Sequence, residues 1–421
     1  MEGIQKRVEM KAYRHIVIPL FIASILAFLD RVNVSYAALT MNQDLGFTGQ
    51  IYGIGAGIFF AGYVLFEVPG AIWAEKWSPS KWIARIMVTW GLVCVGMAFI
   101  KNDTQFFIAR FLLGACEASL YPVIYASVIP RWFLSKDRPR AIALTLTSLQ
   151  VSAIIGAPFA GWLVGVTFAG FKGWQSLFIL EGGVTVLFGF VVYFWLKDDP
   201  EKVSWLEPEE KKFLRESLAK ENAAKTENKK FTVMQALTNF EVIKLCLIYF
   251  LWVTGFWGFG FWMPTVLKAA SGWSNMAIGW LTVPPMVMSL IAMVYIGNSS
   301  SRNNEKRWHG AIPLMIGAIG MLIGAFSSNS YIAYLSVVLA AIGVYGPFGV
   351  WWSYPTTFLT GAAAAGAIGL INSVGNIGGF IGPYSIGYLK DITGSFSLSY
   401  IYLSGSLFLS ALLMLTLKEK K

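Results

Sequence analysis

Apolar residues occur along this chain in long runs, separated by short stretches of charged and turn-forming residues. The runs lie at about 16–38, 52–75, 82–101, 105–129, 140–166, 174–196, 242–268, 275–298, 309–327, 331–354, 361–389 and 396–417. A helix needs roughly 20 mostly apolar residues to cross the hydrocarbon core of a bilayer. The pattern therefore predicts an all-α integral membrane protein with twelve transmembrane helices.

One long polar stretch divides these runs into two groups of six. It covers residues 197–241 and includes WLEPEEKKFLRESLAK, whose order of proline, acids and then bases predicts a short surface helix. We therefore expect a six-helix bundle at 1–196, a cytoplasmic linker at 197–241 and a second six-helix bundle at 242–421. GAPFAGW at 156–162 weakly resembles GPYSIGY at 382–388, as expected of a transporter built from two related halves.

The basic residues sort by side of the membrane. If the N-terminus is cytoplasmic, the inside segments hold 26 Lys and Arg residues and the outside loops hold only 4. Cytoplasmic loops carry this excess in membrane proteins, so we expect a multi-pass protein of the cytoplasmic membrane with both termini inside. The excess of basic residues in the cytoplasmic segments then explains the net charge of +10, and the expected partner is the lipid bilayer and not a nucleic acid.

Composition excludes several classes of protein. The 421 residues are 56% hydrophobic and only 13% charged, against about 25% charged in a soluble domain. Cys94, Cys116 and Cys246 lie in apolar runs without the spacing of a zinc site, so we expect no metal or disulfide. The chain has no P-loop, HExxH or GxSxG motif, so we expect neither an enzyme nor an ATP-driven pump, and no cofactor.

Six ionisable residues lie at bilayer depth in the predicted spans. Each costs at least about 2.5 kcal/mol at bilayer depth, so each needs a partner or a function. In span one, the acid of the pair Asp30 and Arg31 is suited to carry a proton and the base to bind a substrate carboxylate, although a structural ion pair with another helix is the alternative. The six are Asp30, Arg31, Glu67, Arg110, Glu117 and Glu181.

Arg110 and Glu117 are seven residues apart in span four, which places them on one helix face. A buried carboxylate balanced by an arginine can take up a proton when an anion occupies that arginine. We therefore expect Glu117 to couple proton and substrate, with Arg110 either functional or structural. Glu67 and Glu181 lie nearer the ends of their spans and are expected to be structural hydrogen-bonding groups.

Further polar residues lie near the middle of spans two, five and eleven. They are Tyr63, Gln150, Asn372 and Asn376, and they could bond a carboxylate or sugar acid, although polar contacts between helices are the alternative. Span seven is crowded with aromatic residues, which usually pack or anchor a helix and which could also form the wall of a substrate site.

These segments resemble the anion:cation symporter family of the major facilitator superfamily. The matching stretches are FLDRVNVSYAAL, FFAGYVLFEVPG, KWIARIMVTWGLV, RFLLGACEASLYPVI, PRWF, GWQSLFILEG, WLEPEE, EKRWH and GLINSVGNIGGFIGPYSIGYLKD. Within the family, they are most similar to the bacterial tartrate, hydroxyphenylacetate and sugar-acid permeases. The resemblance implies two bundles, alternating access and proton-coupled uptake of an organic carboxylate. It assigns proton coupling to Asp30 and Glu117, and substrate or gate contacts to Arg31, Tyr63, Arg110, Gln150 and Asn376.

Two loops depart from the superfamily pattern. The loop after span two reads AIWAEKWSPSK where GxxxDRxGRR is usual, and Ser301 stands where the second half usually carries an acid. Such loops help to hold the outward-open state, so the conformational balance of this chain is expected to differ.

The sequence thus predicts a monomeric secondary transporter that carries a small organic anion with protons. A facilitator or anion exchanger without proton coupling is the alternative, and a non-transporting membrane sensor is a more distant one. Tartrate-like dicarboxylates, sugar acids and aromatic acids all need the same arginine and amide groups, so the substrate stays open.

Overall fold

The structure is a computed structural model that describes residues 2–167, 169–225, 239–354 and 361–417. All its helices and their bounds follow, first for the first half of the chain. These are α1 (Glu2–Ala12), η1 (Tyr13–Val17), α2 (Ile18–Leu45), α3 (Gly49–Trp77), α4 (Pro79–Met97), α5 (Asp103–Glu117), α6 (Leu120–Pro122), η2 (Val123–Val128), α7 (Ile129–Trp132), α8 (Arg138–Leu146), α9 (Ser148–Val164) and α10 (Gly173–Trp195).

The described parts of the linker and of the second half of the chain also contain helices. They contain η3 (Pro200–Lys202), α11 (Pro208–Lys225), α13 (Phe240–Ser271), α14 (Asn275–Leu281), α15 (Val283–Asn303), α16 (Arg307–Phe326), α17 (Ser330–Tyr345), α18 (Phe348–Trp351), α19 (Gly361–Thr393) and α20 (Ser397–Leu415). The predicted all-α membrane architecture is confirmed.

Ten helical segments in the described part of the chain are long and apolar enough to cross a membrane. They do not include α4 and α19, although these helices occupy the predicted spans 82–101 and 361–389. The number of twelve spans therefore stays a prediction.

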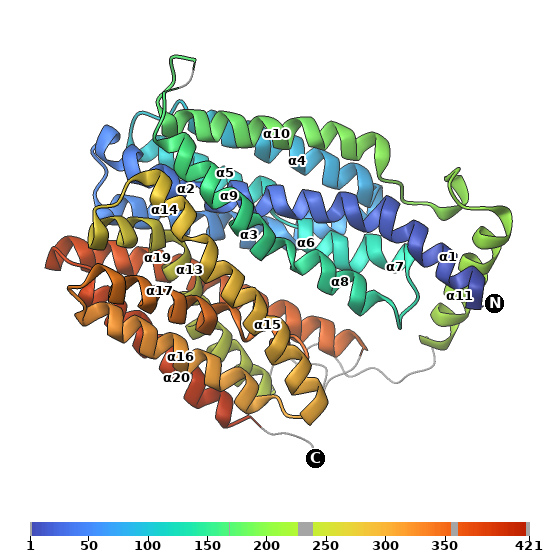
Figure 1. The fold of residues 1–421 in the computed structure, drawn as a ribbon. Helices are drawn as coiled ribbons and strands as arrows, with labels where there is room; N and C mark the ends of the chain where they lie inside the picture. The colour runs from blue at the N-terminus through green and yellow to red at the C-terminus, as the bar shows by residue number, and fades with distance from the viewer. Residues whose placement is uncertain (1, 168, 226–238, 355–360, 418–421) are drawn as a thin grey trace.

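Figure 1 shows the helices of the first half of the chain above those of the second half, with their axes running along a common direction. The two groups meet along α3 and α19, α2 and α13, and α9 and α14. Small residues permit the closest of these contacts. A Cβ atom added to Gly53 of α3 would lie 2.6 Å from the carbonyl oxygen of Pro383 on α19, and one added to Gly387 would lie 2.1 Å from that of Gly49.

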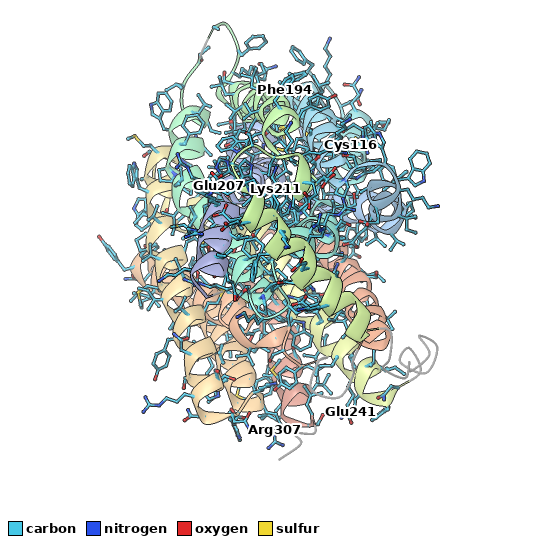
Figure 2. The ribbon with its side chains drawn as sticks, turned by 90° about the vertical axis from the view of Figure 1, so that its right-hand side faces the viewer. Cys116, Phe194, Glu207, Lys211, Glu241 and Arg307 are labelled. Carbon is cyan, nitrogen blue, oxygen red and sulfur yellow. The ribbon has the colours of Figure 1, made fainter. Side chains whose placement is uncertain are left out.

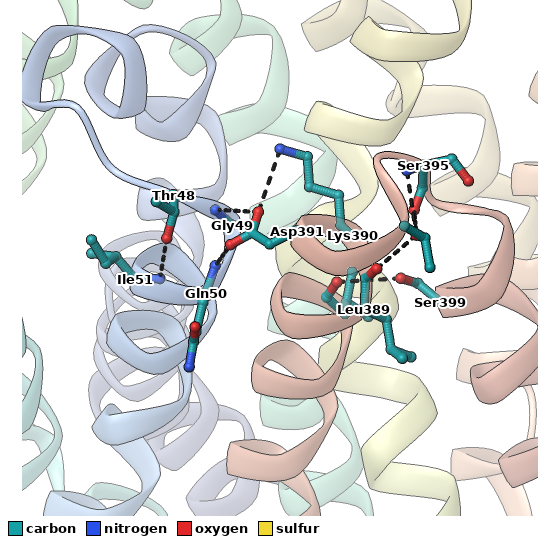
Figure 3. Close-up of polar contacts among 11 residues, drawn as sticks. Thr48, Gly49, Gln50, Ile51, Leu389, Lys390, Asp391, Ser395 and Ser399 are labelled. Carbon is teal, nitrogen blue, oxygen red and sulfur yellow. Dashed lines mark hydrogen bonds and ion pairs between the residues drawn. The ribbon is translucent and has the colours of Figure 1, made fainter.

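A carboxylate joins the two halves of the chain at the start of α3. Asp391, near the end of α19, accepts the backbone N–H groups of Gly49 at 3.0 Å and Gln50 at 2.6 Å (Figure 3). These donors have no partner inside α3 because they belong to its first turn, and the positive end of the helix dipole favours an anion there. Asp391 therefore caps a helix that belongs to the other half of the chain.

The linker helix α11 lies at the opposite end of the molecule. Figure 2 shows this end, with Glu207 and Lys211 of the linker in its upper half and Arg307, at the start of α16, at the bottom. Helix α11 begins at Pro208, as its sequence predicts. Glu210 of α11 accepts from Lys11 of α1 at 2.8 Å, so the linker helix is bound to the first half of the chain. Residues 226–238 of the predicted linker lie outside the described residues.

The fourth predicted span is interrupted, which its hydrophobic pattern does not indicate. Helix α5 ends at Glu117, and Ser119 takes a left-handed conformation with φ of 75° before α6 begins. Pro122 cannot donate to the carbonyl of Ala118, so the regular hydrogen bonding of a helix fails here. The Trp82 indole N–H donates to the Ser119 hydroxyl at 2.9 Å and fixes the break. The break leaves Glu117 at the end of a helix inside the molecule.

Candidate functional site

Arg31 of α2 and Glu117 of α5 form an ion pair in the interior. Nε of Arg31 donates to Oε1 of Glu117 at 3.1 Å, and Nη2 donates to the same oxygen. Glu117 is fully buried, whereas Arg31 keeps 9% of its surface exposed. The arginine is therefore the less buried member of this pair. Oε2 of Glu117 is buried without a hydrogen-bond partner among the described residues.

Aromatic rings surround the Arg31 guanidinium on several sides. Its Cζ lies 5.1 Å from the ring centre of Phe59, 5.2 Å from that of Tyr63, 5.6 Å from that of Trp257 and 6.0 Å from that of Tyr121. Ring faces attract a cation and exclude water from it. Tyr63, which was predicted as a site residue, thus lies beside Arg31, and Trp257 brings a residue of the second half of the chain to the same group.

Asp30 points away from its neighbour Arg31. Its carboxylate accepts from the Thr185 hydroxyl at 2.6 Å, the Trp90 indole at 3.0 Å and the Cys94 thiol at 3.4 Å. These partners come from α10 and α4 and are all fully buried, as is Asp30. Successive residues on a helix do not face each other. One helix therefore presents an acid to one side of the first half of the chain and a base to the other.

Arg110 is fully buried and bonds to the backbone. It donates to the carbonyl oxygens of Gly55 at 3.1 Å, Ala56 at 3.2 Å and Arg31 at 3.4 Å. Its side chain thus ties α5 to α3 and to the turn of α2 that carries Arg31. Arg110 lies two turns, or about 10 Å, before Glu117 along α5. The buried partner of Glu117 is Arg31, from a different helix.

Two of the three predicted amide residues contact the other half of the chain. Asn372 of α19 donates to Glu67 of α3 at 3.2 Å, and Gln150 of α9 donates to the Met293 sulfur at 3.6 Å. Oε1 of Gln150 and Nδ2 of Asn376 are buried without a partner among the described residues. An acceptor and a donor are thus buried and unpaired, while Asn372 and Glu67 form a contact across the two halves.

A pocket lies between the halves, enclosed by α2, α9 and α10 on one side and by α13, α15 and α17 on the other. Trp257 lines it and separates it from Arg31. Asn33 and Glu181 also line the pocket, and neither was predicted as a site residue. Asn33 lies three residues after Asp30, and this spacing was the available signal for it, because residues three apart on a helix are neighbours.

Known proteins resemble this chain over nearly its whole length. The sequence profile of the Major Facilitator Superfamily matches residues 20–383. A protein of Agrobacterium vitis named "Putative tartrate transporter" is 39% identical over 417 residues, which are 98% of this chain and 92% of that protein. A quinolone resistance transporter of Acinetobacter baumannii is 34% identical, covering 91% of this chain and 89% of that protein.

A solved structure with the same fold is that of a D-xylose-proton symporter. It superposes with a TM-score of 0.76 over 96% of this chain and 97% of that chain, at 14% sequence identity. At this identity the likeness shows the fold alone. The profile match and the relatives show that this non-enzymatic, multi-pass transport protein belongs to the Major Facilitator Superfamily.

Proposed function

We propose that this protein is a proton-coupled symporter of a small organic carboxylate that works by alternating access. The observation that carries the proposal is the buried ion pair between Arg31 and Glu117, in which only the arginine retains exposed surface. A guanidinium of this kind is suited to bind a carboxylate with two parallel hydrogen bonds. The aromatic rings around it provide a site from which water is excluded.

Competition for Arg31 provides the coupling. When a substrate carboxylate binds Arg31, Glu117 loses its buried cation, and an unpaired buried charge costs about 3–5 kcal/mol. Glu117 avoids this cost by taking up a proton, which then crosses with the substrate. When the substrate leaves, Arg31 again stabilises the carboxylate form of Glu117 and the proton is released.

The other predicted residues have supporting roles in this proposal. Asp30 carries a second proton on the opposite side of α2, and Tyr63 contacts the substrate beside Arg31. Arg110 holds the backbone of α2 and α3 in place and so positions Arg31. The free amide groups of Gln150 and Asn376 bind the polar part of the substrate.

Asn372 releases Glu67 when the two halves of the chain separate, because its bond spans them. The two halves rock about this central site and expose it alternately to each side of the membrane. We place the protein in the cytoplasmic membrane as a monomer with both termini inside, as the distribution of basic residues favours.

The name of one similar protein supports the carboxylate. Tartrate, in the name of the Agrobacterium vitis relative, is a dicarboxylate. The name concerns that protein, and tartrate is therefore the first probe for this one.

The test is uptake of labelled tartrate into proteoliposomes with and without an inward proton gradient. The wild type should accumulate tartrate about tenfold per pH unit for each proton carried, because 1.4 kcal/mol is a factor of ten. In Glu117→Gln, gradient-driven accumulation should fall by about tenfold per pH unit, because the proton that Glu117 carries is lost. Tartrate counterflow, which needs no net proton movement, should persist within about threefold. Unchanged uphill uptake in Glu117→Gln would exclude Glu117 as the coupling group.

The same assay separates the alternatives. A facilitator or an exchanger equilibrates tartrate without regard to the gradient, and a sensor moves nothing. Reversing the gradient tests export. The reason for this test is that the Acinetobacter baumannii relative is named a quinolone resistance transporter. If tartrate fails, a thermal-shift screen of other carboxylates follows, since a ligand at 100 times its Kd stabilises by about 2.7 kcal/mol.

A further inference from the structure

Glu181 of α10 is a buried acid that the proposed coupling does not use. Only 6% of its surface is exposed, it lines the pocket between the halves of the chain, and its Oε2 has no hydrogen-bond partner among the described residues. Asn33 on the facing helix α2 also lines the pocket and leaves Oδ1 without a partner. The Asn33 side chain also interacts with Glu181. One buried oxygen on each of these two residues thus lacks a donor, and a proton on Glu181 supplies one.

Asp30, in contrast, has no direct access to this pocket. It is fully buried, and its partners Thr185, Trp90 and Cys94 are fully buried as well and do not line the pocket. A proton that reaches Asp30 from the pocket must therefore pass through another group.

Glu181 is suited to be that group, and Thr185 lies where it can connect Glu181 to Asp30. Glu181 and Thr185 are four residues apart on α10, so their side chains are neighbours on one helix face, about 5–6 Å apart at Cβ. The Thr185 hydroxyl donates to Asp30 at 2.6 Å. Asp30 and Asn33 are similarly one turn apart on α2. The Asn33 amide donates to the Cys94 sulfur at 3.5 Å, and the Cys94 thiol donates to Asp30. Between the two acids, the Thr185 hydroxyl is the group that can both accept and donate a proton.

The charges around Glu181 favour a shared proton. The titratable groups that face it are Asp30 and Tyr36 from α2 and Cys94 from α4, with Tyr345 of α17 across the pocket; α9 contributes no titratable residue. Within the described residues no cation pairs with Asp30 or Glu181. Two neighbouring buried carboxylates without a cation cannot both stay charged at a low cost.

We propose that Glu181 is the proton-access residue of Asp30, and that the two acids form one coupled proton-binding site connected by Thr185. Glu181 takes a proton from the pocket and passes it to the Thr185 oxygen. Thr185 gives its own hydroxyl proton to Asp30, so that Glu181 returns to a carboxylate, Asp30 becomes neutral and Thr185 is unchanged. The use of this proton in transport rests on the proposed function, but the site itself does not.

Acid-induced infrared difference spectra of the lipid-reconstituted protein, without substrate, test the site. Glu181→Gln should remove one protonated-carboxyl band, and Asp30→Asn should remove another and displace the band of Glu181. The changes in Glu181→Gln and Asp30→Asn should not add up to that of the double variant. Ser35→Ala is the matched control, because Ser35 lines the pocket and bonds only within its own helix.

Time-resolved spectra after a pH step test the connection. Thr185→Val should slow the appearance of the Asp30 band by at least about tenfold, and Thr185→Ser, which keeps the hydroxyl, should restore the rate. Additive spectra, a Glu181→Gln spectrum with no lost band, or an unchanged rate in Thr185→Val would overturn the proposal. If Glu181→Gln does not fold, the displaced Glu181 band in Asp30→Asn decides. Failure of tartrate uptake leaves all these results interpretable, because no substrate is present.

Discussion

The two halves of the chain contribute different chemistry to the interface between them. All six ionisable residues predicted to lie at bilayer depth belong to the first half, on α2, α3, α5 and α10. The second half supplies aromatic and amide groups instead, with its charged residues near the helix ends. The aromatic and amide groups include Trp257, Phe261, Tyr345, Asn372 and Asn376.

We infer from this difference that the first half determines proton coupling and the second half determines the shape of the substrate site. In the proposed mechanism, charge and protons are exchanged within the first half, around α2, whose residues Asp30 and Arg31 point to opposite sides. The second half closes the site with neutral surfaces that attract a cation without competing for it. Variants of the two halves should therefore fail in different ways.

The largest expected effect comes from Arg31. Arg31→Gln should abolish tartrate uptake and lower the free energy of unfolding by about 3–5 kcal/mol, because Glu117 is left buried and unpaired. The double variant Arg31→Gln/Glu117→Gln should regain stability without regaining uptake. Thermal unfolding and proteoliposome uptake measure the two effects. Arg31→Lys is the matched control, which keeps the charge but loses the planar fork. Persistent uptake in Arg31→Gln would remove the basis of the proposed function.

A smaller effect is expected on the other side of the interface, at Trp257. Trp257→Ala should raise the KM for tartrate by about tenfold, because the ring beside the guanidinium is lost, while the gradient still drives accumulation. Trp257→Phe should retain most of the affinity. Trp252→Phe, on the same helix but outside the pocket, is the control. Loss of proton coupling in Trp257→Ala would show that the division between the halves is wrong.

The sequence was sufficient for the features that depend on local composition. Hydrophobic runs predicted the positions of helices such as α3 and α13, because a membrane span needs a continuous apolar segment. The cost of a charge at bilayer depth singled out Asp30, Arg31 and Glu117 without any structure.

The sequence was insufficient for the features that depend on how helices are rotated and bent. It offered Arg110 as the companion of Glu117 on one helix face, whereas the ion pair is made with Arg31, 86 positions away. The break at Ser119 and the pocket position of Glu181 depend on contacts with α4 and α2, which periodicity within a single helix does not contain. The roles of the site residues themselves stay predictions.

The contact between the halves at Asp391 should have a moderate effect. Asp391→Asn removes the charge from the first turn of α3, where such a charge contributes about 0.3–1 kcal/mol. Separation of the two halves at this end should become about twofold to fivefold more populated. Distances between spin labels on the loops that precede α3 and follow α19 measure this shift. Asp103→Asn is the control, because Asp103 bonds only within the first turn of its own helix α5. Equal distance distributions in Asp391→Asn and the wild type would show that the contact does not hold the halves together.

The smallest effect concerns the linker helix α11, which packs on the outer surface of the first half of the chain. Burial raises the pKa of Glu210, but hydrogen bonds from Lys11, the Glu207 N–H and Arg7 outweigh it and hold the pKa below its usual value. A lowered carboxyl pKa stabilises the bound helix above the ordinary value of about 4.3, and this stabilisation is lost as the pH falls through the lowered value. Hydrogen-exchange protection of α11, corrected for intrinsic rates, should therefore decline on acidification. Glu210→Gln should reduce it by about fivefold at pH 7, equivalent to about 1 kcal/mol, with uptake unchanged. The exposed neighbour Glu209 provides the control Glu209→Gln. If the hydrogen-exchange protection of α11 is the same in Glu210→Gln and Glu209→Gln, apolar contacts hold the linker helix in place. The difference in charge between the two halves would then not extend to the linker.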